Sequence, residues 1–397
     1  MKKNALFWLL GFLIAAVILI CPASRGLSEA AEPLKLGSYL ALSGPGAPWG
    51  VAVMRCGEMR IEEYNTAGGI TIGGKKYKLE LITYDHKYTS AGGLEAINKL
   101  IFQDKVNFIA TTFGTAPNLA GLSVSEPNKV LHCTLASGAG LLGPDKPYSF
   151  RLLMGAAEYM PALYRWLHRE YPKAKKVAVL NRDDAWGKDC NKYGRKGAEA
   201  QGFKVVYDGN FPLGTKDFAP ILTRMISEKP DIVETTGCLL GEGVLLLKQA
   251  RELGYTGPLV TNLATVPELV LKMAGAEAAE EAISALTIIT DEEDPSVPQK
   301  VKELARRYRE KYNEPLAGLG VNGYDSITVV VEAIKKANSL YTAKVAKAMK
   351  ALQLNLLQGP AKFTGEKTYG IKHQLVLPIQ ISRCRGGKFT LVALEKP

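Results

Sequence analysis

Three glycines near the start of the chain come closest to the spacing of a nucleotide-binding turn. Gly44, Gly46 and Gly50 follow an apolar run of strand length, residues 34–42, and lie in a Ser/Gly/Pro turn. Such a turn after the first strand of an α/β sheet is a common ligand site. The dinucleotide fingerprint is not met, because the third glycine is one position too far and the next acidic strand end, Asp85, is too distant. The turn therefore predicts one wall of a binding cleft.

A second glycine-rich segment, residues 69–75, approaches the phosphate-binding loop of nucleotide hydrolases. Lys76 occupies the position where Ser or Thr must reach the magnesium ion, and the segment precedes a predicted strand instead of following one. We therefore predict neither a phosphate site nor a nucleotide cofactor here.

Catalytic side chains are not arranged in any known constellation. The chain contains no G-x-S-x-G or H-E-x-x-H motif, and its four histidines fall in different predicted elements: His86, His132, His168 and His373. The pair Asp183–Asp184 sits at a strand-to-helix turn, where acidic residues usually cap the helix. The sequence favours binding over catalysis, and we expect neither an enzyme nor a cofactor. A nucleotide-dependent enzyme is the less favoured alternative.

The cysteines do not predict a metal site. Beyond position 30 there are five, an odd number, without a C-x-x-C pair and without a histidine at metal-ligand spacing: Cys56, Cys133, Cys190, Cys238 and Cys384. Disulfide pairing stays open. Cys133 lies in the apolar run 130–135, which favours a buried single thiol.

Strand and helix patterns alternate twice along the chain. The first series has strands at 34–42, 77–84, 106–112 and 130–135, with helices at 51–65, 92–103 and 118–126. The second has strands at 176–180, 204–209, 231–235, 259–262 and 283–289, with helices at 159–170, 189–200, 218–227 and 243–253. Charged and apolar helices follow at 299–312 and 323–337, and two strand-like runs at 375–394. This alternation predicts an α/β protein with two doubly wound parallel-sheet lobes.

The N-terminal segment, residues 1–30, has the features of a secretory signal peptide. Two lysines precede the apolar run 5–20, and Ser28-Glu29-Ala30 supplies a small-residue cleavage site. A lipid anchor at Cys21 is not predicted, because Ile20 is too bulky for a lipobox. We expect an exported, periplasmic protein. Its formal net charge of +11 favours anionic ligands, but the basic residues are scattered, so no nucleic-acid partner is predicted.

A series of short motifs follows the same order as in one family. They are LSGPGAPWG (42–50), Asn65-x-x-Gly68-Gly69-Ile70, Tyr84-Asp85, Trp186-Gly187, Asp217-Phe218, Lys229-Pro230-Asp231, Ala250-Arg251-Glu252-Leu253-Gly254 and Tyr324-Asp325. Together they resemble the branched-chain amino acid (Leu/Ile/Val) binding proteins, which are type I periplasmic substrate-binding proteins of ABC importers. The likeness covers nearly all of the chain after residue 30.

The resemblance implies two lobes joined by three hinge crossings, with the ligand enclosed between them. Lobe one would comprise residues 34–152 and 288–373, and lobe two residues 153–287 and 374–397. The implied ligand-binding residues are Ser43, Trp49, Phe113, Gly114, Thr115, Ala136, Ser137, Gly138, Trp186, Cys238, Leu263 and Tyr324. The implied partners are a small-molecule ligand and the transmembrane subunits of an ABC permease, and we expect a monomer. An extracellular ligand sensor of the same fold is the alternative.

Two departures from the family concern the ligand. Amino-acid binders carry an acidic residue in the turn after the strand 259–262, where it pairs with the ligand ammonium, and here residues 262–265 are Asn-Leu-Ala-Thr. Gly138 replaces a common hydroxyl, and Cys238 stands where an aromatic residue is frequent. Because a buried ammonium without a counter-charge is costly, we predict a carboxylate or amide ligand without an α-ammonium group.

Overall fold

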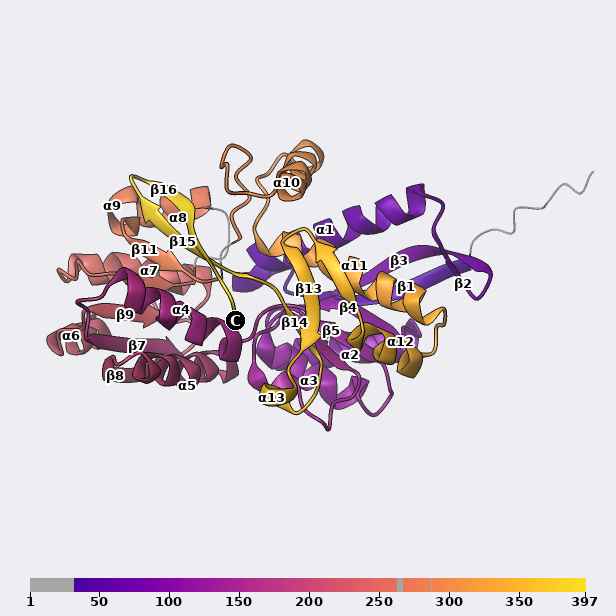
Figure 1. Cartoon of the computed structure of the whole chain (residues 1–397), viewed down its shortest axis with the longest axis horizontal. Helices are drawn as coiled ribbons and strands as arrows, with labels where there is room; N and C mark the ends of the chain where they lie inside the picture. The colour runs from indigo at the N-terminus through magenta and orange to yellow at the C-terminus, as the bar shows by residue number, and fades with distance from the viewer. Residues whose placement is uncertain (1–31, 263–266, 287) are drawn as a thin grey trace, which may run out of the picture.

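Two β-sheets form the centres of two lobes in the computed structural model, which describes residues 32–262, 267–286 and 288–397. The signal-peptide prediction for residues 1–30 and the predicted ligand contact at Leu263 lie outside the described residues. Figure 1 shows the lobes side by side, with the charged helix α10 (Gln299–Tyr312) beside the passage between them. Apart from three antiparallel edges, the strands run parallel, so the predicted α/β class with two lobes is confirmed.

The first sheet has nine strands in the order β12-β13-β14-β6-β5-β4-β1-β3-β2. Their bounds are β1 (Glu32–Leu40), β2 (Ile70–Ile72), β3 (Lys75–Asp85), β4 (Phe108–Thr112), β5 (Leu131–Thr134), β6 (Ser149–Arg151), β12 (Gln353–Leu356), β13 (Gly359–Thr364) and β14 (Gln374–Val376). One face packs against α1 (Ala47–Thr66), α11 (Leu319–Ala337) and α12 (Thr342–Lys350), and the other against α2 (Ser90–Asn98) and α3 (Thr115–Ser125). Short turns are η1 (Gly44–Gly46), η2 (Lys99–Gln103), η3 (Ala139–Leu141) and α13 (Glu366–Tyr369).

The second sheet has seven strands in the order β16-β15-β11-β10-β9-β7-β8. Their bounds are β7 (Lys176–Arg182), β8 (Lys204–Phe211), β9 (Ile232–Thr235), β10 (Leu259–Thr261), β11 (Ala282–Ser284), β15 (Ile379–Arg385) and β16 (Lys388–Glu395). The helices α4 (Ala156–Glu170) and α5 (Ala185–Ala200) pack together, as do α6 (Ala219–Ser227), α7 (Leu240–Glu252), α8 (Pro267–Ala274) and α9 (Ala276–Ala279).

The chain passes between the sheets three times: after β6, after β11 and after β14. The first passage falls at the predicted boundary near residue 152. The third corrects the prediction, because β14 pairs with β13 and β6 in the first sheet, so residues 374–376 belong to lobe one. The predicted strand 283–289 is also shorter, since β11 ends at Ser284 and the chain then leaves the sheet.

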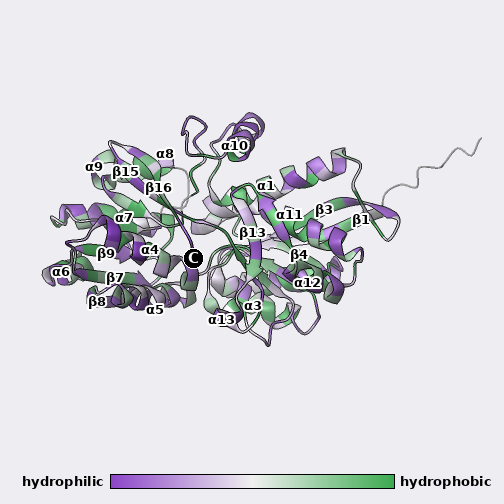
Figure 2. Ribbon diagram, viewed as in Figure 1, coloured by the Kyte–Doolittle hydropathy of each residue, from purple (hydrophilic) through white to green (hydrophobic). Residues whose placement is uncertain are grey.

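The core follows the apolar strand pattern. Figure 2 shows hydrophobic residues concentrated along the strands and hydrophilic residues along α10. All five described cysteines are buried free thiols, which confirms the prediction for Cys133. Within the described part of the chain, no helix has both the length and the apolar character needed to cross a membrane.

Glycine spacing at the first turn serves close packing. A Cβ on Gly50 would lie 2.0 Å from the carbonyl oxygen of Ala41, so only glycine lets the start of α1 rest on the end of β1. The helix therefore begins at Ala47, earlier than the predicted residue 51, and Trp49 lies in its first turn. The predicted glycine-rich turn is the N-terminus of a packed helix.

Candidate functional site

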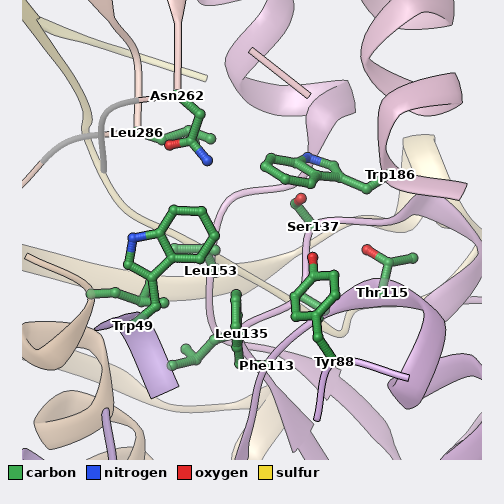
Figure 3. A pocket seen from close by; sticks show the side chains of 13 residues that line it. Trp49, Tyr88, Phe113, Thr115, Leu135, Ser137, Leu153, Trp186, Asn262 and Leu286 are labelled. Carbon is green, nitrogen blue, oxygen red and sulfur yellow. The ribbon is translucent and has the colours of Figure 1, made fainter. Parts of the chain in front are cut away.

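A cavity of about 480 Å³ lies between the lobes, at the carboxyl ends of the parallel strands. Both lobes and two of the crossings contribute to its wall, which Figure 3 shows. The lining residues are Trp49, Tyr88, Phe113, Gly114, Thr115, Leu135, Ala136, Ser137, Leu153, Trp186, Asn262, Leu286 and Leu319.

Aromatic rings form much of this wall. Trp49 and Phe113 pack edge to face, with ring centres 5.6 Å apart, and Tyr88 lies 5.3 Å from Phe113. Trp186 enters from lobe two and lies across the cavity from these rings (Figure 3). Aromatic pairs of this geometry are rigid and offer large apolar contact areas. The cavity is therefore shaped for a flat or branched apolar group.

His86 fixes two of the aromatic residues. Its Nδ1 accepts the backbone N–H of Tyr88 at 2.9 Å, so its Nε2 carries the proton that is donated to the carbonyl of Phe113, also at 2.9 Å. Burial lowers the pKa of His86 to about 4, which keeps the ring neutral and in this tautomer at neutral pH. Lys87 and Tyr88 both have positive φ angles, 51° and 59°. This strained turn is how the chain directs the Tyr88 ring into the cavity.

Hydroxyl groups gather at one end of the cavity. Figure 3 shows the oxygens of Tyr88, Thr115 and Ser137 on the same side, below the Trp186 ring. Thr115 is the first residue of α3. The N-cap position is Gly114, so no side chain accepts a hydrogen bond from the first N–H groups of the helix. The first backbone N–H groups of a helix have no acceptor within the helix. Hydroxyls and N–H groups together make this end a receiver for a carboxylate.

Arg151 holds the turn that carries Ser137. The fully buried guanidinium donates to the backbone carbonyls of Ser137 and Gly138, at 3.1 and 2.8 Å, and to the side chain of Gln374. Because the carbonyls are directed toward Arg151, the turn keeps one orientation relative to the cavity. Arg151 also contacts Glu158 of α4 at 3.4 Å, so the same residue bridges the lobes.

Trp186 is held by hydrogen bonds within lobe two. Its Nε1 donates to the hydroxyl of Tyr159 at 3.0 Å, and that hydroxyl lies 3.1 Å from the sulfur of Cys190. Asp184 caps α5 by accepting the N–H of Gly187 at 2.8 Å, which fixes the helix turn that carries the indole. The earlier interpretation of Asp184 as a helix cap is thus confirmed.

The lobes also meet beside the cavity. The backbone N–H of Ala139, just after the Ser137 turn, donates to the carboxylate of Asp189 on α5 at 2.7 Å. The hydroxyl of Tyr369 in lobe one donates to Glu158 in lobe two at 2.8 Å. The structure therefore represents the two lobes in contact around the cavity.

The cavity brings together most of the predicted ligand-binding residues. Those that line it are Trp49, Phe113, Gly114, Thr115, Ala136, Ser137 and Trp186. Gly138 lies just outside, because its backbone packs on Thr115 and its carbonyl faces Arg151. The thiol of Cys238 is buried against Thr261, at 3.3 Å from its hydroxyl, and is not among the lining residues.

Ser43 and Tyr324 lie apart from the cavity, contrary to the prediction. Ser43 is exposed, and its hydroxyl donates to Asp85 at 2.5 Å. Tyr324 lies on the outer side of α11, where its hydroxyl donates to Glu63 at 2.5 Å. From α11 it is Leu319, more than one helical turn before Tyr324, that lines the cavity.

Sequence reasoning missed Tyr88 and the apolar residues of the crossings. Leu153 and Leu286 lie in segments that leave the sheets, so no strand pattern marks them. Tyr88 follows a predicted strand end, Asp85, and this was the one available signal. Asn262, which lies in the predicted turn, does line the cavity, and its amide donates to the carbonyl of Cys238 at 3.0 Å.

Charged side chains are absent from the described cavity lining, and the neighbouring residues 263–266 and 287 are uncharged by sequence. Across the described residues, no group of three or more His, Cys, Asp or Glu side chains is placed to hold a metal ion. What the cavity offers is aromatic surface, hydroxyls and backbone N–H groups.

Comparison with known proteins identifies the architecture. The family model described as "Periplasmic binding protein" matches residues 33–388. The chain belongs to this family. Its type I fold is that of a leucine-binding protein from Thermotoga maritima, with a TM-score of 0.78, 22% identity, and coverage of 92% of this chain and 99% of the other.

Two further relatives differ in ligand class. The Leu/Ile/Val-binding protein homolog 7 of Brucella suis is 25% identical over 83% of this chain and 84% of its own. A solute-binding protein of an ABC transporter from Rhodopseudomonas palustris, in complex with 3,4-dihydroxy benzoic acid, has a TM-score of 0.77 and 25% identity over 92% of this chain and 97% of its own. The predicted resemblance to the branched-chain amino acid type is therefore confirmed. Proteins of this family are extracytoplasmic solute-binding proteins of ABC transporters and not enzymes.

Proposed function

We propose that this periplasmic binding protein encloses a small carboxylate, or its amide, that lacks an α-ammonium group. The observation that carries the proposal is the uncharged cavity lining described above. An ammonium group enclosed there would lose its hydration without gaining a counter-ion, which costs several kcal/mol. A carboxylate, in contrast, meets hydroxyls and the N-terminus of α3 at one end of the cavity.

The aromatic wall supports a ligand with a planar or branched apolar body. Trp49, Tyr88, Phe113 and Trp186 surround the cavity from both lobes. One relative is a Leu/Ile/Val-binding homolog and another was solved with 3,4-dihydroxy benzoic acid. The uncharged lining of this cavity suits 3,4-dihydroxy benzoic acid, which has no ammonium group, better than it suits an amino acid. Aromatic carboxylates are thus the first class to test.

The position of Thr115 and Ser137 in the cavity supports ligand-binding roles for both residues. In the proposed complex, their hydroxyls and the N–H groups that begin α3 bind the carboxylate, and Trp186 covers it from lobe two. Charge-assisted hydrogen bonds of this kind are about twice as strong as neutral ones.

Delivery is proposed to follow the family pattern. The ligand-bound protein, exported by a cleaved signal peptide and monomeric, would be recognised by the transmembrane subunits of an ABC permease. The two-lobed architecture, with three passages between the sheets, supports a hinge closure around the ligand.

A thermal-shift screen of the purified protein tests the ligand class. The panel contains benzoate and 3,4-dihydroxybenzoate, branched aliphatic carboxylates, the corresponding amides, and L-leucine, L-isoleucine and L-valine. We expect stabilisation by carboxylates, since a ligand at 100 times its Kd stabilises the folded state by about 2.7 kcal/mol. Stabilisation by the amino acids alone would refute the proposal.

A further inference from the structure

Arg182 is a buried cation at the carboxyl end of β7, the ligand edge of the second sheet. Its side chain is only 1% exposed. One terminal nitrogen, Nη2, pairs with Asp184, and the other, Nη1, lies 3.8 Å from Glu242. Nε and Nη1 make no hydrogen bond to any described residue. Buried donors without an acceptor are rare and call for an explanation.

The two neighbouring carboxylates are already engaged at helix N-termini. Asp184 accepts the N–H of Gly187 at the start of α5. Glu242 accepts the N–H of Leu239 at the start of α7, at 2.9 Å, and that of Gly214 at 3.3 Å. Helix N-termini and backbone donors offset part of these negative charges, so the guanidinium is not fully neutralised by them. Its Nε and Nη1 also remain available as hydrogen-bond donors.

Arg182 reaches the cavity through Tyr88. The guanidinium lies over the Tyr88 ring, 5.3 Å from its centre, and joins lobe two to lobe one. The Tyr88 hydroxyl belongs to the polar end of the cavity with Thr115 and Ser137 (Figure 3). Burial raises the pKa of Tyr88, while the positive charge of Arg182 opposes that rise. The positive charge of Arg182 therefore acts at the hydroxyl that faces the ligand.

We propose that Arg182 is the positioning residue that makes the cavity select an anionic ligand over its neutral amide. The charge of Arg182 orients and polarises the Tyr88 hydroxyl as a donor to the ligand carboxylate. The contact between Arg182 in lobe two and the Tyr88 ring in lobe one lies beside the place where the carboxylate is enclosed. This proposal rests on the proposed ligand class and narrows it from carboxylates and amides to carboxylates.

Paired ligands separate charge from shape. Benzoate and benzamide have nearly the same size, and so do 4-methylpentanoate and 4-methylpentanamide, so that within each pair the main difference is the charge. The pair whose carboxylate the wild-type protein binds more tightly serves as the probe. Calorimetry then measures the Kd of both members for wild type, Arg182→Gln, Arg182→Lys and Tyr88→Phe.

The expected result is a selective loss. Arg182→Gln weakens carboxylate binding by about 10- to 100-fold, the range of a charge-assisted hydrogen bond, and changes amide binding by less than about 3-fold. Arg182→Lys restores part of the carboxylate affinity, because it keeps the charge without the planar fork. Tyr88→Phe keeps the ring under the guanidinium and loses carboxylate affinity through the missing hydroxyl.

A matched control is Arg251→Gln. Arg251 also lies in lobe two, 5.9 Å from the ring centre of Tyr255, and donates to backbone carbonyls away from the cavity. Its removal is expected to leave both Kd values unchanged, and melting curves of every variant verify folding. If Arg182→Gln and Arg182→Lys each lost as much affinity for the amide as for the carboxylate, the role of Arg182 would be overturned and the proposed function would stay intact. A wild-type protein that binds neither carboxylate would overturn both.

Discussion

The cavity between the lobes and the groove around Tyr324 in lobe one are two concave regions of the molecule, and they differ in how their polar groups are used. The groove, of about 1020 Å³, is lined by charged residues of α1, α10 and α11, among them Arg60, Lys300, Glu303 and Arg307. The cavity is half as large and uncharged. The candidate ligand site is therefore neither the largest nor the most charged of the concave regions in the described part of the chain.

Charged groups in the groove mostly satisfy one another. Glu63 accepts Tyr324, Arg60 and Arg307 at 2.5, 2.7 and 2.6 Å. Burial raises the pKa of Glu63, but these hydrogen bonds outweigh it and the net shift is downward. The cavity, by contrast, is lined by the hydroxyl-bearing residues Tyr88, Thr115 and Ser137 among aromatic rings, with Thr115 at the start of α3. The comparison favours the cavity as the candidate ligand site, because its few polar groups are set among aromatic and aliphatic side chains.

The largest effect is expected from a negative charge at the polar end of the cavity. Ser137→Asp places a carboxylate against the ligand carboxylate in a site shielded from water, so affinity should fall by about 1000-fold or more. Titration by calorimetry measures it. The control Ser123→Asp lies on the exposed face of α3. Similar affinity in both variants would contradict the assignment of this end.

A smaller loss of ligand affinity is expected when the indole ring of Trp186, which lobe two contributes to the cavity wall, is removed. Trp186→Ala deletes an aromatic wall and leaves Tyr159 without its indole donor, so ligand affinity should fall by about 30- to 300-fold. Trp186→Phe keeps a ring and should lose less. Equilibrium dialysis with the best carboxylate checks both, and equal affinity of Trp186→Ala and wild type would place the ligand elsewhere.

The buried carboxyl group of Asp325, which lines the groove, should make the folding free energy depend on pH. Burial raises its pKa to about 7, so the neutral acid is favoured in the folded state. Its stabilising contribution is complete below the unfolded pKa near 3.9 and is lost as the pH rises toward 7. Between pH 5 and pH 8, Asp325→Asn should therefore gain about 2–3 kcal/mol of folding free energy relative to wild type. Urea unfolding at both pH values measures this difference, and a constant offset would contradict it.

The smallest effect is expected at Tyr324. Tyr324→Phe removes the hydrogen bond to Glu63 and should cost about 1–2 kcal/mol of folding free energy. Ligand affinity should stay within about 2-fold of wild type, because the hydroxyl faces the groove. A large loss of affinity with little loss of stability would restore Tyr324 to the ligand site.

The strand ends of the site were predictable, and the side chains that organise it were not. An apolar strand followed by turn residues marks where parallel strands end, and within these turns the resemblance to the family named Trp49, Phe113, Thr115, Ser137 and Trp186, which line the cavity. Tyr88 depends on consecutive positive φ angles that non-glycine residues rarely adopt, so the sequence carries little signal for it.

Long-range partners account for the remaining differences. Arg151 and Arg182 act through contacts with residues far along the chain, Gln374 and Glu242 among them. The short antiparallel strands β12–β14 return to the first sheet after α12, and a three-residue strand such as β14 is too brief for a periodic pattern. The boundary at residue 373 was set for this reason a few residues too early.

Calorimetry with L-leucine and 4-methylpentanoate tests the central claim most directly, because the two ligands differ mainly in the α-ammonium group. An uncharged cavity predicts that 4-methylpentanoate binds at least about 10-fold more tightly than L-leucine, since the ammonium would be buried without a counter-ion. Tight binding of L-leucine, with no measurable affinity for 4-methylpentanoate, would contradict the account.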